Sequence, residues 1–175
     1  MKNLKSFNES NREFYEKIDI SWKDIEVIKS SPYKNTVYEC VFTDSEISLR
    51  PISLMSFSVI ASKFNRIHTS YPLSSEYRGI GLGYKCYKSV INEVGYVSSD
   101  EEGTNIYSRN VWKHLIKDKD YYSFEIKKAC DYISESNYTD GFFIFKKTLD
   151  RKKIGKVLNE FKKSGGEIIT MDPNF

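Results

Sequence analysis

Three glycines within five residues, directly before a strong helical pattern, constrain this chain more than any other feature. The run is Arg78-Gly79-Ile80-Gly81-Leu82-Gly83, and apolar residues then recur at helical spacing up to Val94. A helix that begins in a glycine turn directs free backbone N–H groups and its positive end at one point. We therefore expect an anion site here, suited to a phosphate or a pyrophosphate.

The spacing of these glycines separates several interpretations. A dinucleotide-binding fingerprint needs G-x-G-x-x-G within a parallel βαβ unit, and Gly79-Ile80-Gly81-Leu82-Gly83 is spaced differently. A Walker loop needs Gly-Lys followed by Ser or Thr, which this run lacks. The plain alternative, a glycine turn that only starts a helix, stays open because short glycine motifs are common.

The residues before the turn are rich in strand formers. Strands are predicted over 36–42, 47–52, 54–60 and 65–73. Because short turns join them, they favour an antiparallel meander, interrupted at Pro51. Further upstream, Trp22, Ile25 and Ile28 would share one face of a short helix over 22–29.

Strands and helices alternate after the turn. We predict a strand over 96–99, a helix over 104–117, strands over 121–126 and 142–145, and a basic helix over 150–163. The apolar face of the last helix would consist of Ile154, Val157, Leu158 and Phe161. Ile168-Ile169 would form a final strand, so the fold class is α/β of the α+β kind, with a C-terminal helix–strand extension.

Composition limits the function classes. The 175 residues suit one domain, and an aromatic content of 15% supports a packed core. The net charge of +3 is too small to indicate nucleic-acid binding unaided. The helix over 150–163 is basic, which would suit an acidic partner or nucleic acid. We favour a solvated face, because Asp150 and Glu160 interleave and no base-stacking pattern accompanies it.

The cysteines and the chain start bear on location. Cys40, Cys86 and Cys130 are an odd, widely spaced set, which is a poor disulfide framework, and with two histidines in the chain no metal site is expected. The chain has no apolar leader and no run of ~20 apolar residues, so we expect a cytoplasmic protein without membrane contact. Residues 1–11 would be a flexible tail, and 12–175 a single domain.

Two segments resemble the GNAT N-acetyltransferase superfamily. Arg78-x-x-Gly81-x-Gly83 is similar to the R/Q-x-x-G-x-G/A loop that binds the pyrophosphate of acyl-CoA in that family. The longer run from Leu73 to Gly83 resembles the family's V-x-P-x-Y-R-G-x-G-x-G segment. Asn105-Ile106-Tyr107-Ser108, followed by Trp112, resembles its N-x-x-A/S-x-x-x-Y helix. The resemblance covers residues 65–117.

The resemblance implies a fold and a cofactor. The fold is a twisted, mixed and mostly antiparallel sheet flanked by helices, in which two central strands splay apart around the pantetheine arm of acetyl-CoA. The turn would bind the pyrophosphate through backbone amides, the end of the preceding strand would pair with pantetheine, and the later helix would lie beside it. The implied contacts are Leu73, Ser74, Arg78, Gly79, Ile80, Gly81, Leu82, Gly83, Asn105 and Ser108.

The implied reaction is direct transfer of an acetyl group to a primary amine of a protein or small molecule. Family members often use a tyrosine as the acid for the leaving thiol, and Trp112 stands at that position. An indole N–H donates a hydrogen bond but is no practical proton donor. The candidate catalytic residues are His68, Tyr71 and Tyr107. His68 is equally compatible with an ordinary strand histidine, and Tyr71 with a core residue.

Two functions therefore remain. The first is an acetyl-CoA-dependent N-acyltransferase with an unidentified amine acceptor, acting without a metal as a monomer or a homodimer. The alternative is a catalytically inactive GNAT-fold protein that acts by binding, as a regulator or a phage-encoded interaction protein.

Overall fold

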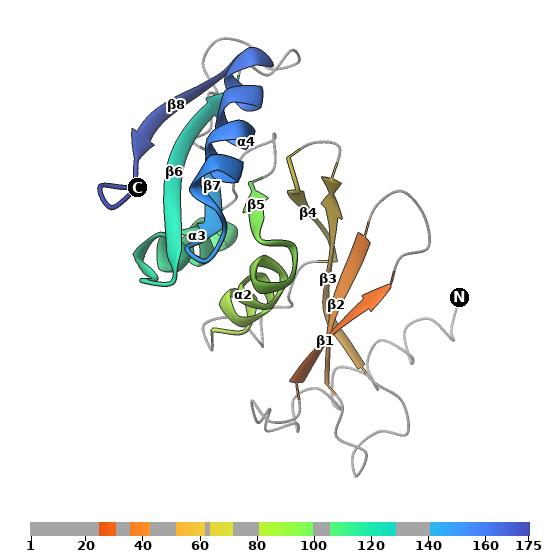
Figure 1. Cartoon of the computed structure of the whole chain (residues 1–175). Coiled ribbons are helices and arrows are strands. Elements are labelled where there is room, and N and C mark those ends of the chain that lie inside the picture. Colours follow the sequence, from red (N-terminus) through yellow and green to blue (C-terminus); the bar gives the residue numbers. More distant parts are fainter. Residues whose placement is uncertain are drawn as a thin grey trace.

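The computed structural model describes residues 25–30, 36–42, 52–61, 64–71, 81–99, 106–128 and 141–175. Within them, strands and helices follow one another along the chain as in Figure 1. The elements are β1 (Ile25–Ser30), β2 (Thr36–Phe42), β3 (Ile52–Ile60), β4 (Arg66–Tyr71), α2 (Leu82–Val94), β5 (Tyr96–Ser98), α3 (Ile106–Lys117), β6 (Tyr121–Lys128), β7 (Gly141–Lys146), α4 (Arg151–Lys163) and β8 (Gly166–Met171).

The described strands form one eight-stranded sheet in the order β1-β2-β3-β4-β5-β7-β6-β8. Strands β1 to β4 are an antiparallel meander, and β5, β7, β6 and β8 are antiparallel to one another. Between these halves, β4 and β5 run parallel. The α+β class with a mixed, mostly antiparallel sheet is therefore confirmed.

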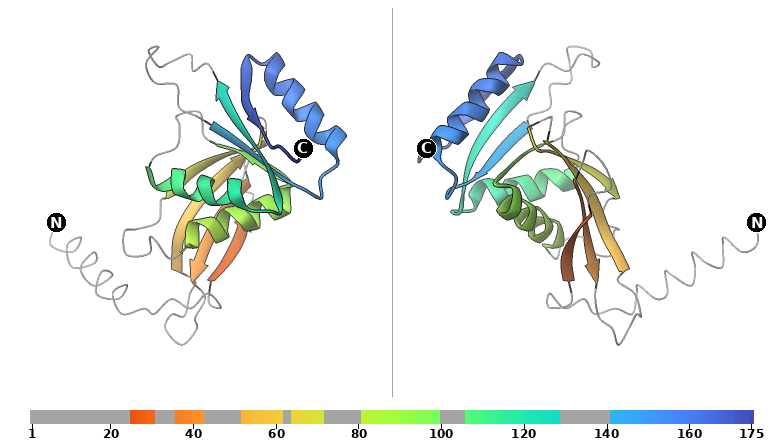
Figure 2. Two further views of the ribbon diagram at one scale, coloured as in Figure 1. Left: turned by 90° about the vertical axis from the view of Figure 1, so that its left-hand side faces the viewer. Right: turned by 45° about the vertical axis from the view of Figure 1, so that its right-hand side comes forward.

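Helices cover both faces of the sheet. Side chains alternate along β7, so that Ile144 packs with α2 and α3 while Phe143 and Phe145 pack under α4. Figure 2 accordingly shows α4 on the far side of β6 and β7 from α3. The two faces carry separate apolar clusters, each a continuous core beneath its own helices.

The cluster under α2 and α3 follows from the helical spacing of the sequence. Helix α2 buries Leu82, Cys86, Tyr87, Val90 and Ile91. Helix α3 adds Trp112 and Leu115, of which Leu115 is fully buried. Full burial of one such large apolar side chain contributes about 1.5–3 kcal/mol, so this cluster fixes α2 against β4 and β5.

The apolar cluster under α4 holds the elements of the C-terminal half together. Asp150 caps α4, because its side chain accepts a hydrogen bond from the Lys152 N–H at 2.7 Å. The predicted inward face, Ile154, Val157, Leu158 and Phe161, is buried as expected. Phe161 meets Phe143 edge-on with ring centroids 5.1 Å apart. Phe64, from the turn between β3 and β4, packs edge-on against Phe161 at 5.6 Å.

One predicted helix is wrong. Residues 25–30 form β1, which pairs with β2 from Ile25↔Phe42 to Ser30↔Val37. The three β-branched residues Ile25, Val27 and Ile28 suit a strand, and pairing with β2 outweighs the weak spacing signal of so short a helix. Trp22 lies outside the described residues.

The other predicted elements are confirmed where the structure describes them. Helix α3 is described from Ile106 and β4 up to Tyr71, so Thr104 and Leu73 lie outside the described residues. The predicted strand over 47–52 falls outside them except for Ile52, which begins β3. The structure also contains the predicted strands that begin near Tyr96, Tyr121, Phe142 and Ile168. The predicted helix after Asp150 forms as well.

Candidate functional site at the start of α2

Helix α2 begins at the end of the glycine run. Gly81 has a φ of 83°, in the left-handed region that favours glycine, and its carbonyl oxygen accepts the first helical hydrogen bond from Lys85 at 3.1 Å. Gly81 is exposed, and the first turn of α2 contains no acidic residue. The N–H groups of a helix's first turn have no intrahelical acceptor, so this end attracts an anion.

The next two residues of the glycine run, Leu82 and Gly83, have structural roles. Leu82 is buried in the cluster under α2. A Cβ built on Gly83 would lie 3.1 Å from Cγ2 of Val111 on α3. Gly83 therefore allows α2 and α3 to approach closely, which brings the glycine turn next to the helix that carries Ser108. Of the described run, Gly81 is the exposed residue.

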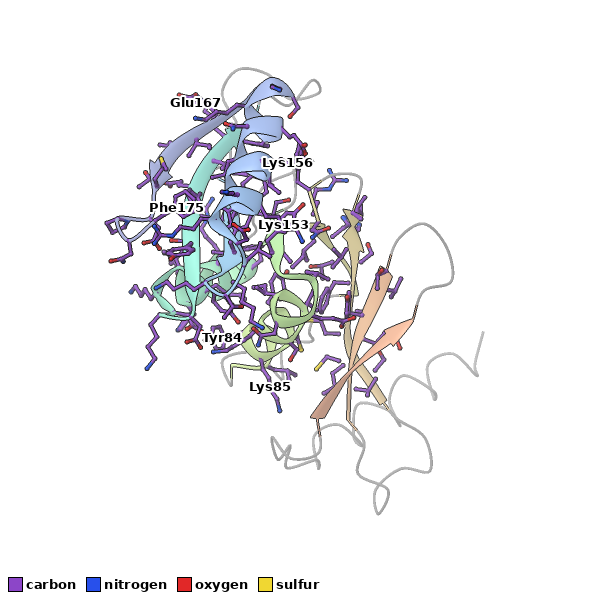
Figure 3. The ribbon with its side chains drawn as sticks, in the orientation of Figure 1. Tyr84, Lys85, Lys153, Lys156, Glu167 and Phe175 are labelled. Carbon is purple, nitrogen blue, oxygen red and sulfur yellow. The ribbon has the colours of Figure 1, made fainter. Side chains whose placement is uncertain are left out.

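An open depression of about 520 Å³ extends along the exposed side of α2 from Gly81. It is lined by Gly81, Tyr84, Lys85, Lys88, Ser89 and Asn92. Figure 3 labels Tyr84 and Lys85 on this side of the helix. The depression thus combines a helix N-terminus with two lysines, a combination that suits a phosphorylated ligand.

A polar cluster ties one wall of the depression to the turn after α3. Asp118 accepts hydrogen bonds from the Tyr84 hydroxyl and, at 2.8 Å, from Lys88 Nζ. Lys88 also contacts Asp120 at 3.2 Å. These contacts hold Tyr84 and Lys88 in place along the depression, and they offset the charge of Lys88.

The pKa values in this cluster follow from the same contacts. The hydrogen bond to Asp118 raises the pKa of Lys88 above its usual value. Burial would raise the pKa of Asp118, but the hydrogen bonds from Lys88, Tyr84 and a backbone N–H outweigh it and lower that pKa. Burial raises the pKa of Tyr121 to about 12, and its hydroxyl donates to Asn92 at 3.2 Å. At neutral pH the cluster is therefore a charged pair with neutral tyrosines.

Strands β4 and β5 meet at the single ladder pair Arg66↔Ser98. The Ser98 N–H donates to the Asn65 carbonyl oxygen at 3.2 Å, and Asn65 Nδ2 donates to the Tyr96 carbonyl oxygen at 3.1 Å. The junction is thus fastened at the start of β4. From there β4 continues to Tyr71 with no further β5 partner in the described sheet.

Two buried serines at this junction were not singled out from the sequence. Ser98 and Ser99 are the buried polar residues of the described chain. The Ser99 hydroxyl accepts from the Phe142 N–H at 2.9 Å, and the Ser99 N–H donates to the Phe142 carbonyl oxygen at 2.9 Å. Their signal in the sequence was a pair of hydroxyl residues ending an apolar strand.

The candidate catalytic residues lie on β4 and α3. His68 is exposed on β4, and Tyr71 is the last residue of that strand. Tyr107 is in the first turn of α3. The side chains of Tyr71 and Tyr107 lie outside the described part of the structure. Next to His68, the hydroxyls of Thr69 and Tyr87 share a hydrogen bond at 3.4 Å.

Trp112 and Ser108 come from the second motif. Trp112 is 2% exposed and lies edge-on to Tyr87, with its ring stacked on Phe142 at 6.1 Å. Trp112 is therefore a core residue. Ser108 is half-buried on α3. His114 is exposed in the last turn of α3, as expected for a surface residue.

The structure packs the first turn of α2 against α3 through Gly83 and Val111, which follows Ser108 by three residues. Six of the predicted cofactor contacts lie outside the described residues. These are Leu73, Ser74, Arg78, Gly79, Ile80 and Asn105.

Among the described residues, no three His, Cys, Asp or Glu side chains gather closely enough to hold a metal ion. No helix in the described ranges is long and apolar enough to cross a membrane. Comparisons with protein-family models, curated proteins and solved structures found no match.

Proposed function

We propose that this chain is a GNAT-type N-acyltransferase that moves an acetyl group from acetyl-CoA directly to a primary amine. The observation that carries the proposal is the central pair of parallel strands, β4 and β5, which share a single ladder pair at the start of β4, so that the rest of β4, towards the glycine turn, has no β5 partner in the described sheet. A GNAT fold uses such a divergence of two central strands to admit the pantetheine arm. The residue patterns around Gly81 and Ser108 support the same assignment.

The start of α2 is the proposed pyrophosphate site. Gly81 is exposed and has no side chain, so a diphosphate can approach the first amides of the helix. Lys85 and Lys88 line the adjoining depression and add positive charge. The charge of Lys88 is partly offset by Asp118, so the backbone amides at the helix end are central to the proposed attraction.

The chemistry places three demands on the site. The amine nitrogen must be neutral to attack the thioester carbon, the carbonyl oxygen must be polarised, and the leaving thiolate must take a proton when the C–S bond breaks. His68, which is exposed on β4, is the proposed base for the amine, acting directly or through a water. Tyr71 and Tyr107 are the proposed hydroxyl groups for substrate and thiolate.

The second candidate function is a protein that binds CoA without turnover. The burial of Trp112 favours it, because the position of the family's usual acid is filled by a core side chain. Such a protein would retain the anion site at α2 and lack an acid for the thiolate.

Binding is tested with a size-matched pair of variants. Gly81→Asn and Gly81→Asp have nearly the same size, and both residues tolerate a positive φ, so they differ chiefly in charge. By calorimetry with acetyl-CoA, we expect Gly81→Asn to bind more weakly than the unmodified chain, because its side chain hinders the approach to the first amides of α2. We expect Gly81→Asp to lose about a further tenfold, equivalent to ~1.4 kcal/mol, because its carboxylate repels the pyrophosphate. Absence of acetyl-CoA binding by the unmodified chain would overturn both candidate functions.

A measurement of turnover distinguishes the transferase from the protein that only binds CoA. Free thiol released from acetyl-CoA is measured with a panel of amines, comprising polyamines, amino acids and lysine peptides. Thiol release that needs an amine and falls in His68→Gln supports the transferase. Tight acetyl-CoA binding with no release across the panel supports the binding protein.

A further inference from the structure

The outward face of α4 carries a row of lysines. Six of the thirteen residues of α4 are Lys or Arg, and one is Glu. Lys152, Lys156 and Lys163 follow one another at helical spacing on the side opposite the buried face, with Asn159 between the last two. Figure 3 labels Lys153 and Lys156 on this helix. We call Lys152, Lys156 and Lys163 the lysine row.

The acidic residues that interleave in the sequence do not lie in this row. Asp150 precedes the helix, and its carboxylate is used as the cap for the Lys152 N–H. Glu160 is exposed and neighbours the row, four residues after Lys156 and three before Lys163, and together with burial its charge raises the pKa of Tyr96 on β5. One carboxylate thus flanks three lysines, and the outward face of α4 keeps a net positive charge.

The lysines of α4 are also unpaired. Lys152, Lys153, Lys156, Lys162 and Lys163 are exposed, and none forms an ion pair within the described residues. Arg151, at the start of the helix, is anchored instead. Its Nη2 donates to the Tyr122 hydroxyl at 3.1 Å and to the Asn174 carbonyl oxygen at 3.2 Å. The row therefore presents a net positive charge on the outward face of α4, with Glu160 as the neighbouring carboxylate.

The outward face of α4 has no apolar anchor of its own. The apolar residues of α4 are buried in the cluster under it, and a Cβ on Gly155 would meet nothing within 4 Å. A protein partner usually needs a buried aromatic or aliphatic anchor, and membrane insertion needs a free apolar face. Single-strand binders add exposed aromatic rings for base stacking. These features are missing from the row, whereas a duplex backbone requires only spaced positive charge.

We propose that the lysine row of α4 binds the phosphate backbone of duplex DNA without sequence preference. Lysine acts as a point charge rather than a bidentate reader, so the contact positions the protein and carries no sequence information. This surface lies on the other face of the sheet from α2, and the proposal does not depend on acetyl-CoA.

The experiment measures anisotropy of a fluorescent 20-base-pair duplex with the full chain at several salt concentrations. The test variant is Lys152→Gln/Lys156→Gln/Lys163→Gln. The matched control is Lys113→Gln/Lys117→Gln/Lys119→Gln, which removes the same charge from exposed positions near the end of α3. Circular dichroism and thermal melting verify that both variants fold. We expect the slope of log K against log salt to fall by about 3 in the test variant and to stay unchanged in the control.

Several outcomes would overturn the proposal. They are absence of duplex binding at 50 mM salt, equal losses in both triple variants, and tighter binding to single-stranded DNA or RNA of the same length. Equal or tighter binding to polyglutamate or to vesicles of phosphatidylserine would also contradict it, because the row would then be selecting for negative charge alone. Two unrelated duplex sequences must bind alike, since a clear preference would show base contacts.

Discussion

Trp112 of α3 and Tyr87 of α2 meet edge-on, with ring centroids 5.4 Å apart and planes at 90°. Both side chains are buried, and the Tyr87 hydroxyl reaches Thr69 on β4. The contact therefore links both helices of the candidate site to the central strand β4. Trp112 therefore supports the candidate site from within the core, and under the proposed GNAT assignment it would stand where that family often has a tyrosine for the leaving thiol.

Truncation of Trp112 tests this structural role. We expect Trp112→Ala to lower the free energy of unfolding by about 3–5 kcal/mol in urea titrations, because a large cavity opens between α2, α3 and β7. Trp112→Phe keeps a ring against Tyr87 and should lose roughly half as much. Acetyl-CoA affinity should stay within about threefold in Trp112→Phe. A stable Trp112→Phe protein that no longer binds acetyl-CoA would contradict the structural assignment.

The carboxylate of Asp118 gives stability a defined pH dependence. Its pKa is lowered in the folded protein, so its contribution is present above the unfolded value of ~3.9 and is lost as pH falls through the folded value. We expect Asp118→Asn to cost about 1–3 kcal/mol at pH 7, because the hydrogen bonds from Tyr84 and Lys88 reach a neutral group. Urea midpoints of the two proteins should converge as pH falls through the lowered pKa of Asp118 in the folded protein.

Asp120→Asn is the control for that measurement. Asp120 contacts the same Lys88 Nζ, but its side chain is 58% exposed, against 8% for Asp118. An exposed ion pair contributes little, so the variant should unfold almost like the unmodified chain. Equal losses from Asp118→Asn and Asp120→Asn would mean that the net charge matters and the buried contact does not.

The thiols of Cys40 and Cys86 should resist modification in the folded protein. Both are fully buried, and the neighbouring Cys40 thiol and burial together raise the pKa of Cys86. In a Cys130→Ser background, we expect no rapid reaction with a disulfide reagent at pH 8 and two thiols reacting immediately in 8 M urea. A fast-reacting thiol without denaturant would show that β2 and α2 separate readily.

The sequence predicted the fold well wherever one spacing dominated a segment. Helix α4 formed with its predicted apolar face, because Ile154, Val157, Leu158 and Phe161 recur at helical intervals after a capping residue. The prediction failed at residues 25–30, where Ile25 and Ile28 fit a helix and β-branching favours a strand. Pairing with β2 determines that residues 25–30 form a strand. This long-range pairing cannot be read from the local sequence pattern.

The candidate site was only partly predictable for a similar reason. Gly81 was found from its spacing, because a glycine turn before a helix is a local signal. The cluster of Tyr84, Lys88 and Asp118 was not found, since it joins α2 to a turn about thirty residues away. The role of Gly83 also depends on tertiary structure. A larger side chain is excluded there because Val111 of α3 packs against Gly83, and the sequence does not show this contact.

Three glycines around α4 are expected to respond differently to substitution by alanine. Gly155 lies inside the helix with open space where a Cβ would point, so Gly155→Ala should raise the free energy of unfolding by about 0.5–1 kcal/mol. A Cβ on Gly166 would lie 2.3 Å from the Phe161 ring, so Gly166→Ala must displace a core side chain and should cost about 1–3 kcal/mol.

Gly165 supplies the control, because a Cβ there meets nothing within 4 Å and its φ is +87°. Gly165→Ala should cost roughly 1 kcal/mol from backbone strain, and Gly165→Asn should recover most of it because asparagine tolerates this conformation. Urea denaturation of the four variants distinguishes helix propensity, backbone strain and steric exclusion. Gly166→Ala as stable as Gly165→Asn would mean that β8 does not pack against Phe161 as described.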